Sequence, residues 1–189
     1  MHRVLVVYAS RHGATRGIAL RIGKTLEAEG FATTILPAHE APHPMIADAV
    51  VIGSATYMGK WLDEAAAYVQ EHHKALAGLP TWLFSSGPVG TESVDKQGRS
   101  VLEDPTQVRE FAAHLLARGT RVFFGRWDPS DPPASLAERL FRLMPVSREL
   151  LPIGDFRDWD AIDGWARAIA HDLRSELAAT EPVTARAGA

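Results

Sequence analysis

Short apolar runs alternate with amphipathic stretches along most of the chain. Residues 4–8 (VLVVY) form a continuous, mostly β-branched run, so a strand there would be buried on both faces, as in the centre of a parallel sheet. After it, Ile18, Ile22 and Leu26 recur four residues apart, which predicts a helix with one apolar face. Gly30 stands where such a helix would end.

The same alternation continues toward the C-terminus. Further strands are predicted at residues 31–36, 47–53, 81–85 and 121–125, and further helices at residues 62–76, 106–118, 136–144 and 161–177. Strands that alternate with helices predict an α/β fold with a parallel sheet. Five strands in 189 residues match a doubly wound sheet of order 2-1-3-4-5, with an insertion after the fifth strand. We expect one domain over residues 1–178 and a flexible tail over residues 179–189.

Composition narrows the classes of function. The chain has 20 Lys and Arg against 23 Asp and Glu, a formal net charge of −3, which gives no general attraction to nucleic acid. Cysteine is absent, which excludes disulfides, thiolate metal sites and thiol nucleophiles. No apolar run approaches the roughly 20 residues that a membrane-spanning helix needs. We therefore expect a cytoplasmic protein.

Two sequence patterns resemble known sites but lack what those sites require. Residues 39–43 spell HExxH, whose two histidines must share one face of a helix, and Pro42 disrupts helical geometry there. Residues 53–60 resemble a phosphate-binding P-loop but carry five residues between the glycines instead of four. Trp61 also replaces the hydroxyl residue that would hold magnesium. We therefore predict neither a metal site nor a nucleoside triphosphate site.

Three loops should meet at one edge of the predicted sheet. In a doubly wound sheet, ligands bind beyond the C-terminal strand ends at the topological switch point, here between strands 1 and 3. The first loop (residues 10–15), the second loop (residues 54–60) and the third loop (residues 85–90) follow strands 1, 3 and 4. They are the candidate binding site.

The first loop joins a strand to the N-terminus of a helix. Such a turn offers free backbone N–H groups and the positive end of the helix dipole. Ser10 and Thr15 add hydroxyls, Arg11 adds a formal charge, and Gly13 lets the backbone turn around an anion. Two interpretations stay open: a phosphate cradle, or a plain helix start capped by Ser10 or Thr15.

The other two loops suit a flat ligand. Tyr57 offers an aromatic ring for stacking, and Gly59 gives the peptide beside it conformational freedom. The alternative is that Tyr57 packs against a neighbouring helix. The third loop consists mostly of small residues, which would let a ring approach the backbone, although an ordinary turn has the same composition.

Together these segments resemble the flavodoxin family. VLVVYASRHGATRGIA resembles the flavodoxin phosphate loop T-x-T-G-x-T, and ADAVVIGSATYMG is similar to the signature D-x-[IV]-[IV]-x-G-S-P-T-Y-x-G. The resemblance covers residues 4–173 and implies FMN, with the phosphate in the first loop and the isoalloxazine between the second and third loops. It implies cofactor contacts from Ser10, Arg11, His12, Gly13, Ala14, Thr15, Ser54, Ala55, Thr56, Tyr57, Met58, Gly59, Ser85, Ser86, Gly87 and Gly90.

Other features resemble the branch of flavodoxin-domain proteins that includes menaquinone-dependent protoporphyrinogen IX dehydrogenase. They are the S-R-[HD]-G-x-T form of the first loop, the stretch RLFRLM at residues 139–144, and D-W before the last helix. This resemblance implies hydride transfer from a porphyrinogen-like substrate to FMN, with a quinone or another acceptor taking the electrons. It implies substrate contacts from Lys60, Arg139 and Arg142, and is compatible with peripheral contact at the inner membrane face and with a homo-oligomer. No catalytic residue is predicted.

Several alternatives stay open. The predicted helix at residues 136–144 is either packed on the sheet or a flap facing substrate and membrane. A flavodoxin-like electron carrier is the second function, although a net charge of −3 is weak for a protein steered to basic partners. A flavin-free binding module is the third, because a fold does not fix a function.

Overall fold

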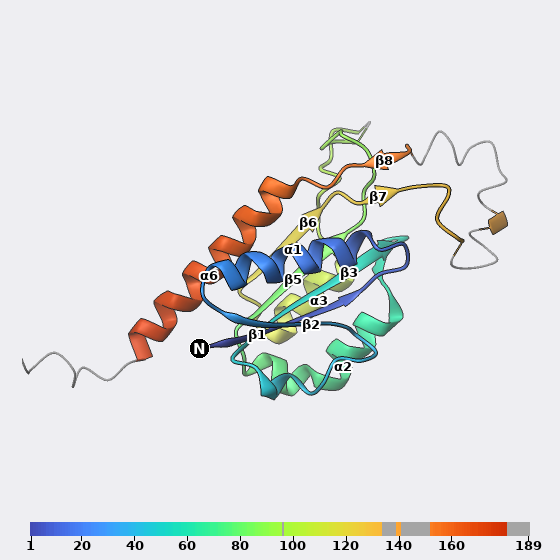
Figure 1. The fold of residues 1–189 in the computed structure, drawn as a ribbon. Helices are drawn as coiled ribbons and strands as arrows, with labels where there is room; N and C mark the ends of the chain where they lie inside the picture. The colour runs from blue at the N-terminus through green and yellow to red at the C-terminus, as the bar shows by residue number, and fades with distance from the viewer. Residues whose placement is uncertain (96, 134–138, 141–151, 181–189) are drawn as a thin grey trace, which may run out of the picture.

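The computed structural model describes residues 1–95, 97–133, 139–140 and 152–180. Five parallel strands form the central sheet in the order β2-β1-β3-β5-β6, which is the predicted doubly wound order (Figure 1). Their bounds are β1 Arg3–Ala9, β2 Ala32–Pro37, β3 Ala49–Tyr57, β5 Thr81–Ser86 and β6 Gly119–Phe123. The predicted α/β fold is confirmed.

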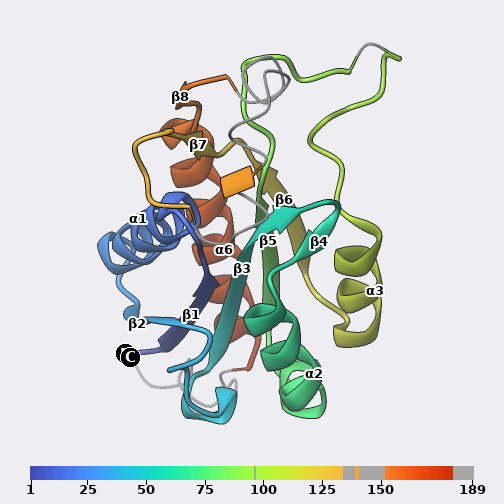
Figure 2. The ribbon, with the colours of Figure 1, turned by 90° about the vertical axis from the view of Figure 1, so that its right-hand side faces the viewer.

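Helices cover both faces of this sheet. The helices α1 (Ala14–Ala28) and α6 (Trp159–Thr180) lie on one face, and α2 (Asp63–Ala77) and α3 (Thr106–Leu115) lie on the other (Figure 2). A short 3₁₀ helix, η1, spans Pro44–Ile46. Side chains of β1 alternate between the two cores, with Val4 and Val6 facing α1 and α6, and Leu5 and Val7 facing α2 and α3. This explains the continuous apolar run, because both faces of β1 are buried.

The structure differs from the predicted elements at the second loop. Strand β3 continues to Tyr57 instead of ending at Gly53, and it pairs antiparallel with β4 (Lys60–Trp61). Met58 and Gly59 form the turn, and both have left-handed φ angles, of 50° and 75°. A two-residue hairpin favours such a turn because its twist matches that of the strands. The segment is therefore a β-hairpin where the sequence predicted a loop.

A second short hairpin follows β6. The strands β7 (Arg126–Trp127) and β8 (Gly154–Asp155) pair antiparallel and stand at the C-terminal edge of the sheet, above the start of α1 (Figures 1 and 2). They form the base of the predicted insertion. Most of the helix predicted at residues 136–144, and residues 181–189 of the predicted tail, lie outside the described residues.

A part-buried ion pair joins α1 to α6. The Arg21 guanidinium donates two hydrogen bonds to the Asp163 carboxylate, with N–O distances of 2.6 and 2.5 Å, and Thr25 Oγ1 donates a third over 2.9 Å. The hydrogen bonds from Arg21 are the main cause that lowers the pKa of Asp163 from its ordinary 3.8 to about 2. Because the pKa is lower in the folded state, the carboxylate contributes stability above about pH 4, and this is lost as the pH falls toward 2.

Replacing Asp163 by Asn is expected to lower the free energy of unfolding at pH 7 by roughly 1–3 kcal/mol, because the Arg21 guanidinium loses a charged acceptor. The loss should shrink between pH 4 and pH 2. Urea unfolding at several pH values measures both effects, with Asp172→Asn on the exposed face of α6 as the matched control. Parallel stability curves for wild type and Asp163→Asn over this pH range would contradict the assignment.

Candidate cofactor site

The three predicted loops lie at one edge of the sheet. Ala9, the last residue of β1, is in register with Ser54, and Ser54 is in register with Ser85 on β5. Ser86 is in turn paired with Phe123 at the end of β6. The first loop, the β3–β4 hairpin (residues 54–61) and the third loop therefore leave the sheet side by side, as the strand order predicted.

The first loop reaches α1 through a left-handed glycine. Gly13 has φ of 78° and is the N-cap residue, and its carbonyl accepts the first helical hydrogen bond from Gly17 N over 2.9 Å. Within the described residues, no side chain caps this helix. The interpretation of Ser10 or Thr15 as a cap therefore fails, and the backbone N–H groups of the first turn are open to a ligand.

Three buried hydroxyls at this edge lack a hydrogen-bond partner in the described part of the chain. They are Ser10 Oγ, Thr15 Oγ1 and Thr56 Oγ1, from the first loop, the first turn of α1 and the end of β3. Buried polar atoms in folded proteins are nearly always hydrogen-bonded, so a bound ligand is a candidate partner for these three hydroxyls. Hydroxyls at the positive end of a helix dipole suit an anion rich in oxygen acceptors. The arrangement fits the phosphate of FMN.

Two other predicted cofactor residues use their hydroxyls to hold the hairpin. Ser54 Oγ donates to Ala55 O over 2.9 Å and accepts from Leu62 N over 3.0 Å. Ser85 Oγ accepts from the indole Nε1 of Trp61 over 2.9 Å. These bonds fix β4 against β3 and β5, and so fix the position of Tyr57 at the end of β3.

The tip of the hairpin carries Tyr57 and two exposed side chains. Tyr57 is half-buried and packs at the margin of the core formed with α2 and α3. The Arg11 guanidinium lies over its ring, with Cζ 4.6 Å from the ring centroid. Met58 is fully exposed in its left-handed conformation, and Lys60 is exposed beside it. The hairpin tip is thus both apolar and positively charged.

The third loop lies against the hairpin. A Cβ on Gly87 would come 3.1 Å from Thr56 Cβ, closer than an ordinary contact, so this position favours glycine. Gly90 has φ of 125°, a conformation open to glycine but not to most residues. Ser86 is buried. The loop is joined to the insertion because Gly125 N donates to Pro88 O over 2.8 Å.

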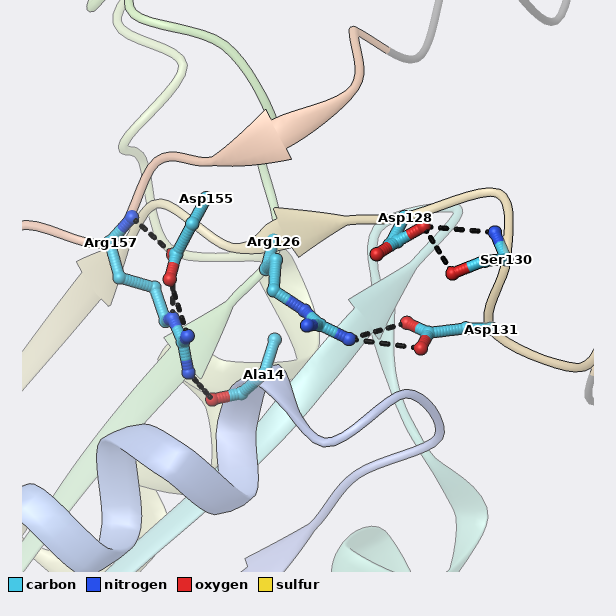
Figure 3. Close-up of polar contacts among 7 residues, drawn as sticks. All are labelled: Ala14, Arg126, Asp128, Ser130, Asp131, Asp155 and Arg157. Carbon is cyan, nitrogen blue, oxygen red and sulfur yellow. Dashed lines mark hydrogen bonds and ion pairs between the residues drawn. The ribbon is translucent and has the colours of Figure 1, made fainter.

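Residues of the β7–β8 hairpin contact the first loop, and the sequence did not reveal them. The rings of His12 and Trp127 form a T-shaped pair, with the centroids 5.9 Å apart and the planes at 87°. Figure 3 shows Arg157 between Asp155 and the start of α1, where its Nη1 donates to Ala14 O over 3.4 Å. Gly17 leaves room for this guanidinium, since a Cβ there would fall well within 3.0 Å of it.

The charges of this hairpin are paired with charges in the hairpin or just beyond its strands. Arg157 donates to both carboxylate oxygens of Asp155, over 2.7 and 2.5 Å, and these bonds are the main cause that lowers the pKa of Asp155. Arg126 donates to both oxygens of Asp131, over 3.0 and 2.7 Å (Figure 3). Two-residue strands carry no usable periodicity, so sequence could not place these groups at the first loop.

The residues predicted for substrate contact are only partly described. Lys60 is exposed at the hairpin, and Arg139 is an exposed helical residue. Arg142 lies outside the described residues. The expected substrate role of all three remains a prediction.

Replacing Tyr57 by Ala is expected to weaken FMN binding by about 0.5–1.5 kcal/mol and to change the flavin absorbance, because the isoalloxazine would lose its stacking contact with the Tyr57 ring. The melting temperature of the apoprotein should change little, since only part of the ring packs on the core. Flavin titration and thermal unfolding measure the two effects, with Tyr57→Phe as the control that keeps the ring. A large loss of apoprotein stability with a normal flavin spectrum would favour the core interpretation instead.

The sheet order and the strand-to-helix loop define an α/β protein of the flavodoxin class. The model of the flavodoxin domain family matches residues 5–130, so the chain belongs to this family. Fold and family together indicate a flavin-binding redox protein. Among the described residues, no helix is long and apolar enough to cross a membrane.

Comparison with curated proteins adds a distant relative. Protoporphyrinogen IX dehydrogenase (quinone) of Escherichia coli strain K12 is 23% identical over 177 residues, which cover 89% of this chain and 95% of that protein. The match therefore runs through nearly the full length of both proteins.

Solved structures show the same fold. An archaeal flavodoxin has a TM-score of 0.56 at 18% identity, covering 91% of this chain and 99% of its own. Flavodoxin 2 from Bacillus cereus has a TM-score of 0.53 at 19% identity, covering 90% and 99%. The rubredoxin oxygen:oxidoreductase of Desulfovibrio gigas has a TM-score of 0.61 at 16% identity, and this chain spans 37% of its length.

Proposed function

We propose that the protein is an FMN-dependent oxidoreductase that oxidises a porphyrinogen-like substrate and passes the electrons to a quinone or another acceptor. The observation that carries the cofactor is the set of unpartnered hydroxyls of Ser10, Thr15 and Thr56 around an uncapped helix N-terminus. The substrate class rests on the relative from Escherichia coli, whose match runs through nearly the whole of both chains.

The candidate site has two parts: a phosphate end, at the first loop and the start of α1, and a ring end, at Tyr57 and the third loop. The hydroxyls of Ser10 and Thr15, with the backbone N–H groups of the first turn of α1, would donate to the phosphate. Tyr57 would stack on the isoalloxazine ring of FMN, and the third loop would bring backbone groups to the edge of the isoalloxazine. Bound FMN supplies the hydride and electron chemistry, and the chain supplies binding, orientation and charge.

The electrostatics of the ring end suit an enzyme with an anionic substrate. Arg11 and Lys60 lie at the hairpin tip, where a carboxylate of a porphyrinogen would meet positive charge. A carrier steered to basic partners would need acidic groups at the exposed flavin edge. The net charge of −3 is also small for such steering.

Anaerobic reduction of the FMN-loaded protein tests this proposal. Protoporphyrinogen IX should bleach the flavin absorbance, and a soluble quinone should restore it. Photoreduction should convert the flavin by two electrons, without a long-lived one-electron-reduced form. Accumulation of that form, with no reaction toward porphyrinogen, would identify an electron carrier. Failure to take up flavin at all would identify a flavin-free binding module.

A further inference from the structure

The positive charge of the first loop lies at the ring end of the candidate site. The sequence suggested that Arg11 adds its charge to a phosphate cradle. In the structure its guanidinium lies over the ring of Tyr57, with Cζ 4.6 Å from the centroid, which is a cation–π geometry. Tyr57 packs against the core, and its pairing with Lys60 in the β3–β4 hairpin fixes its backbone. The Arg11 guanidinium is therefore positioned to contact a ligand that binds beside the Tyr57 ring.

Neighbouring arginines differ from Arg11 in their partners. Arg157 and Arg126 each donate two hydrogen bonds to a carboxylate, so their charges are neutralised locally. The described contact of Arg11 is with the neutral ring of Tyr57, which leaves its formal charge in place. A guanidinium stays protonated at any working pH. The hairpin tip thus carries a permanent positive charge close to its aromatic ring.

We propose that Arg11 tunes the redox potential of the cofactor by stabilising the reduced, anionic form of the flavin ring. This inference rests on the proposed function, because it needs FMN to bind. A hydride from the substrate, or two electrons and one proton from a chemical reductant, converts the neutral oxidised ring into an anion, and the donor is oxidised by two electrons. A cation beside the ring attracts the anion and not the neutral form. Arg11 therefore favours two-electron reduction.

The test compares the affinity of the protein for oxidised and for reduced FMN. Dissociation constants for the oxidised form come from titration, and the two-electron midpoint potential then gives those for the reduced form. Arg11→Gln should weaken binding of reduced FMN about tenfold more than binding of oxidised FMN, a shift of about 30 mV to lower potential. Arg11→Lys keeps the charge and should recover most of this shift. Lys24→Gln removes a positive charge from an exposed position farther along α1 and should leave the potential unchanged.

The outcomes separate this inference from the proposed function. If Arg11→Gln weakens both redox forms equally, Arg11 serves the phosphate and the inference is wrong, while FMN binding stands. An unchanged potential in Arg11→Gln, or an equal shift in Lys24→Gln, also overturns it. If the wild-type protein takes up no FMN, both the proposed function and this inference fail.

Discussion

Replacing Ser10 by Ala and Thr15 by Val together is expected to weaken FMN binding by about 2–5 kcal/mol, roughly 30- to 5,000-fold. Each hydroxyl would donate a charge-assisted hydrogen bond to the phosphate, and such bonds are stronger than neutral ones. Both substitutions nearly keep the shape of the side chain. The loss should therefore come from the missing donors and not from a distorted loop.

The same variant should leave the apoprotein as stable as the wild type, or make it more stable. In the described structure both hydroxyls are buried without a partner, and a buried unpaired hydroxyl costs free energy. Flavin titration and urea unfolding of the apoprotein measure the two quantities, with Thr34→Ala on the exposed side of β2 as the control. A clear loss of apoprotein stability, with FMN affinity unchanged, would show that these hydroxyls are structural.

Replacing Gly53 by Ala is expected to lower the free energy of unfolding by about 3 kcal/mol, the upper end of the usual cost of overpacking. A Cβ on Gly53 would fall well within 3.0 Å of the ring of Phe84, which is fully buried on the neighbouring strand. That ring cannot move aside freely, because Phe123 and Trp165 pack edge-on against it. Gly53 is therefore required for packing between β3 and β5.

Urea unfolding measures this effect, and two further variants make it interpretable. Gly164→Ala places its methyl group in open space on α6 and should raise stability by roughly 0.5–1 kcal/mol, because alanine favours a helix. Adding Phe84→Leu to Gly53→Ala should restore part of the loss by removing ring atoms. If Gly53→Ala alone proves as stable as the wild type, the inference that packing against Phe84 requires glycine at position 53 is wrong.

The apolar pattern predicted most of the fold because burial governs it. The run at β1 is buried on both faces, and the four-residue spacing of Ile18, Ile22 and Leu26 marks the buried side of α1. The β3–β4 hairpin escaped prediction because β4 has only two residues and its turn is Met-Gly in place of the usual Asn-Gly. The β7–β8 hairpin escaped because its strands have two residues each.

The candidate site shows a similar limit. Sequence placed the three loops at one edge, because strand order determines where the loops emerge. The sequence could not show which hydroxyls form hydrogen bonds within the protein and which are left to bind a ligand. Ser85 contacts the indole of Trp61, whereas Ser10 and Thr15 lack such partners in the described residues. It also could not direct Arg11 to Tyr57, since a long side chain can reach either end of the site.

The most direct test of the phosphate cradle compares FMN with riboflavin, which has the same ring but no phosphate. Titration of the apoprotein should show one bound FMN and an affinity for riboflavin that is at least about 100-fold weaker, since several charge-assisted hydrogen bonds are lost. In the variant that combines Ser10→Ala with Thr15→Val, most of this difference should disappear. Equal affinities of the wild-type protein for FMN and riboflavin would contradict the central claim that the first loop holds a phosphate.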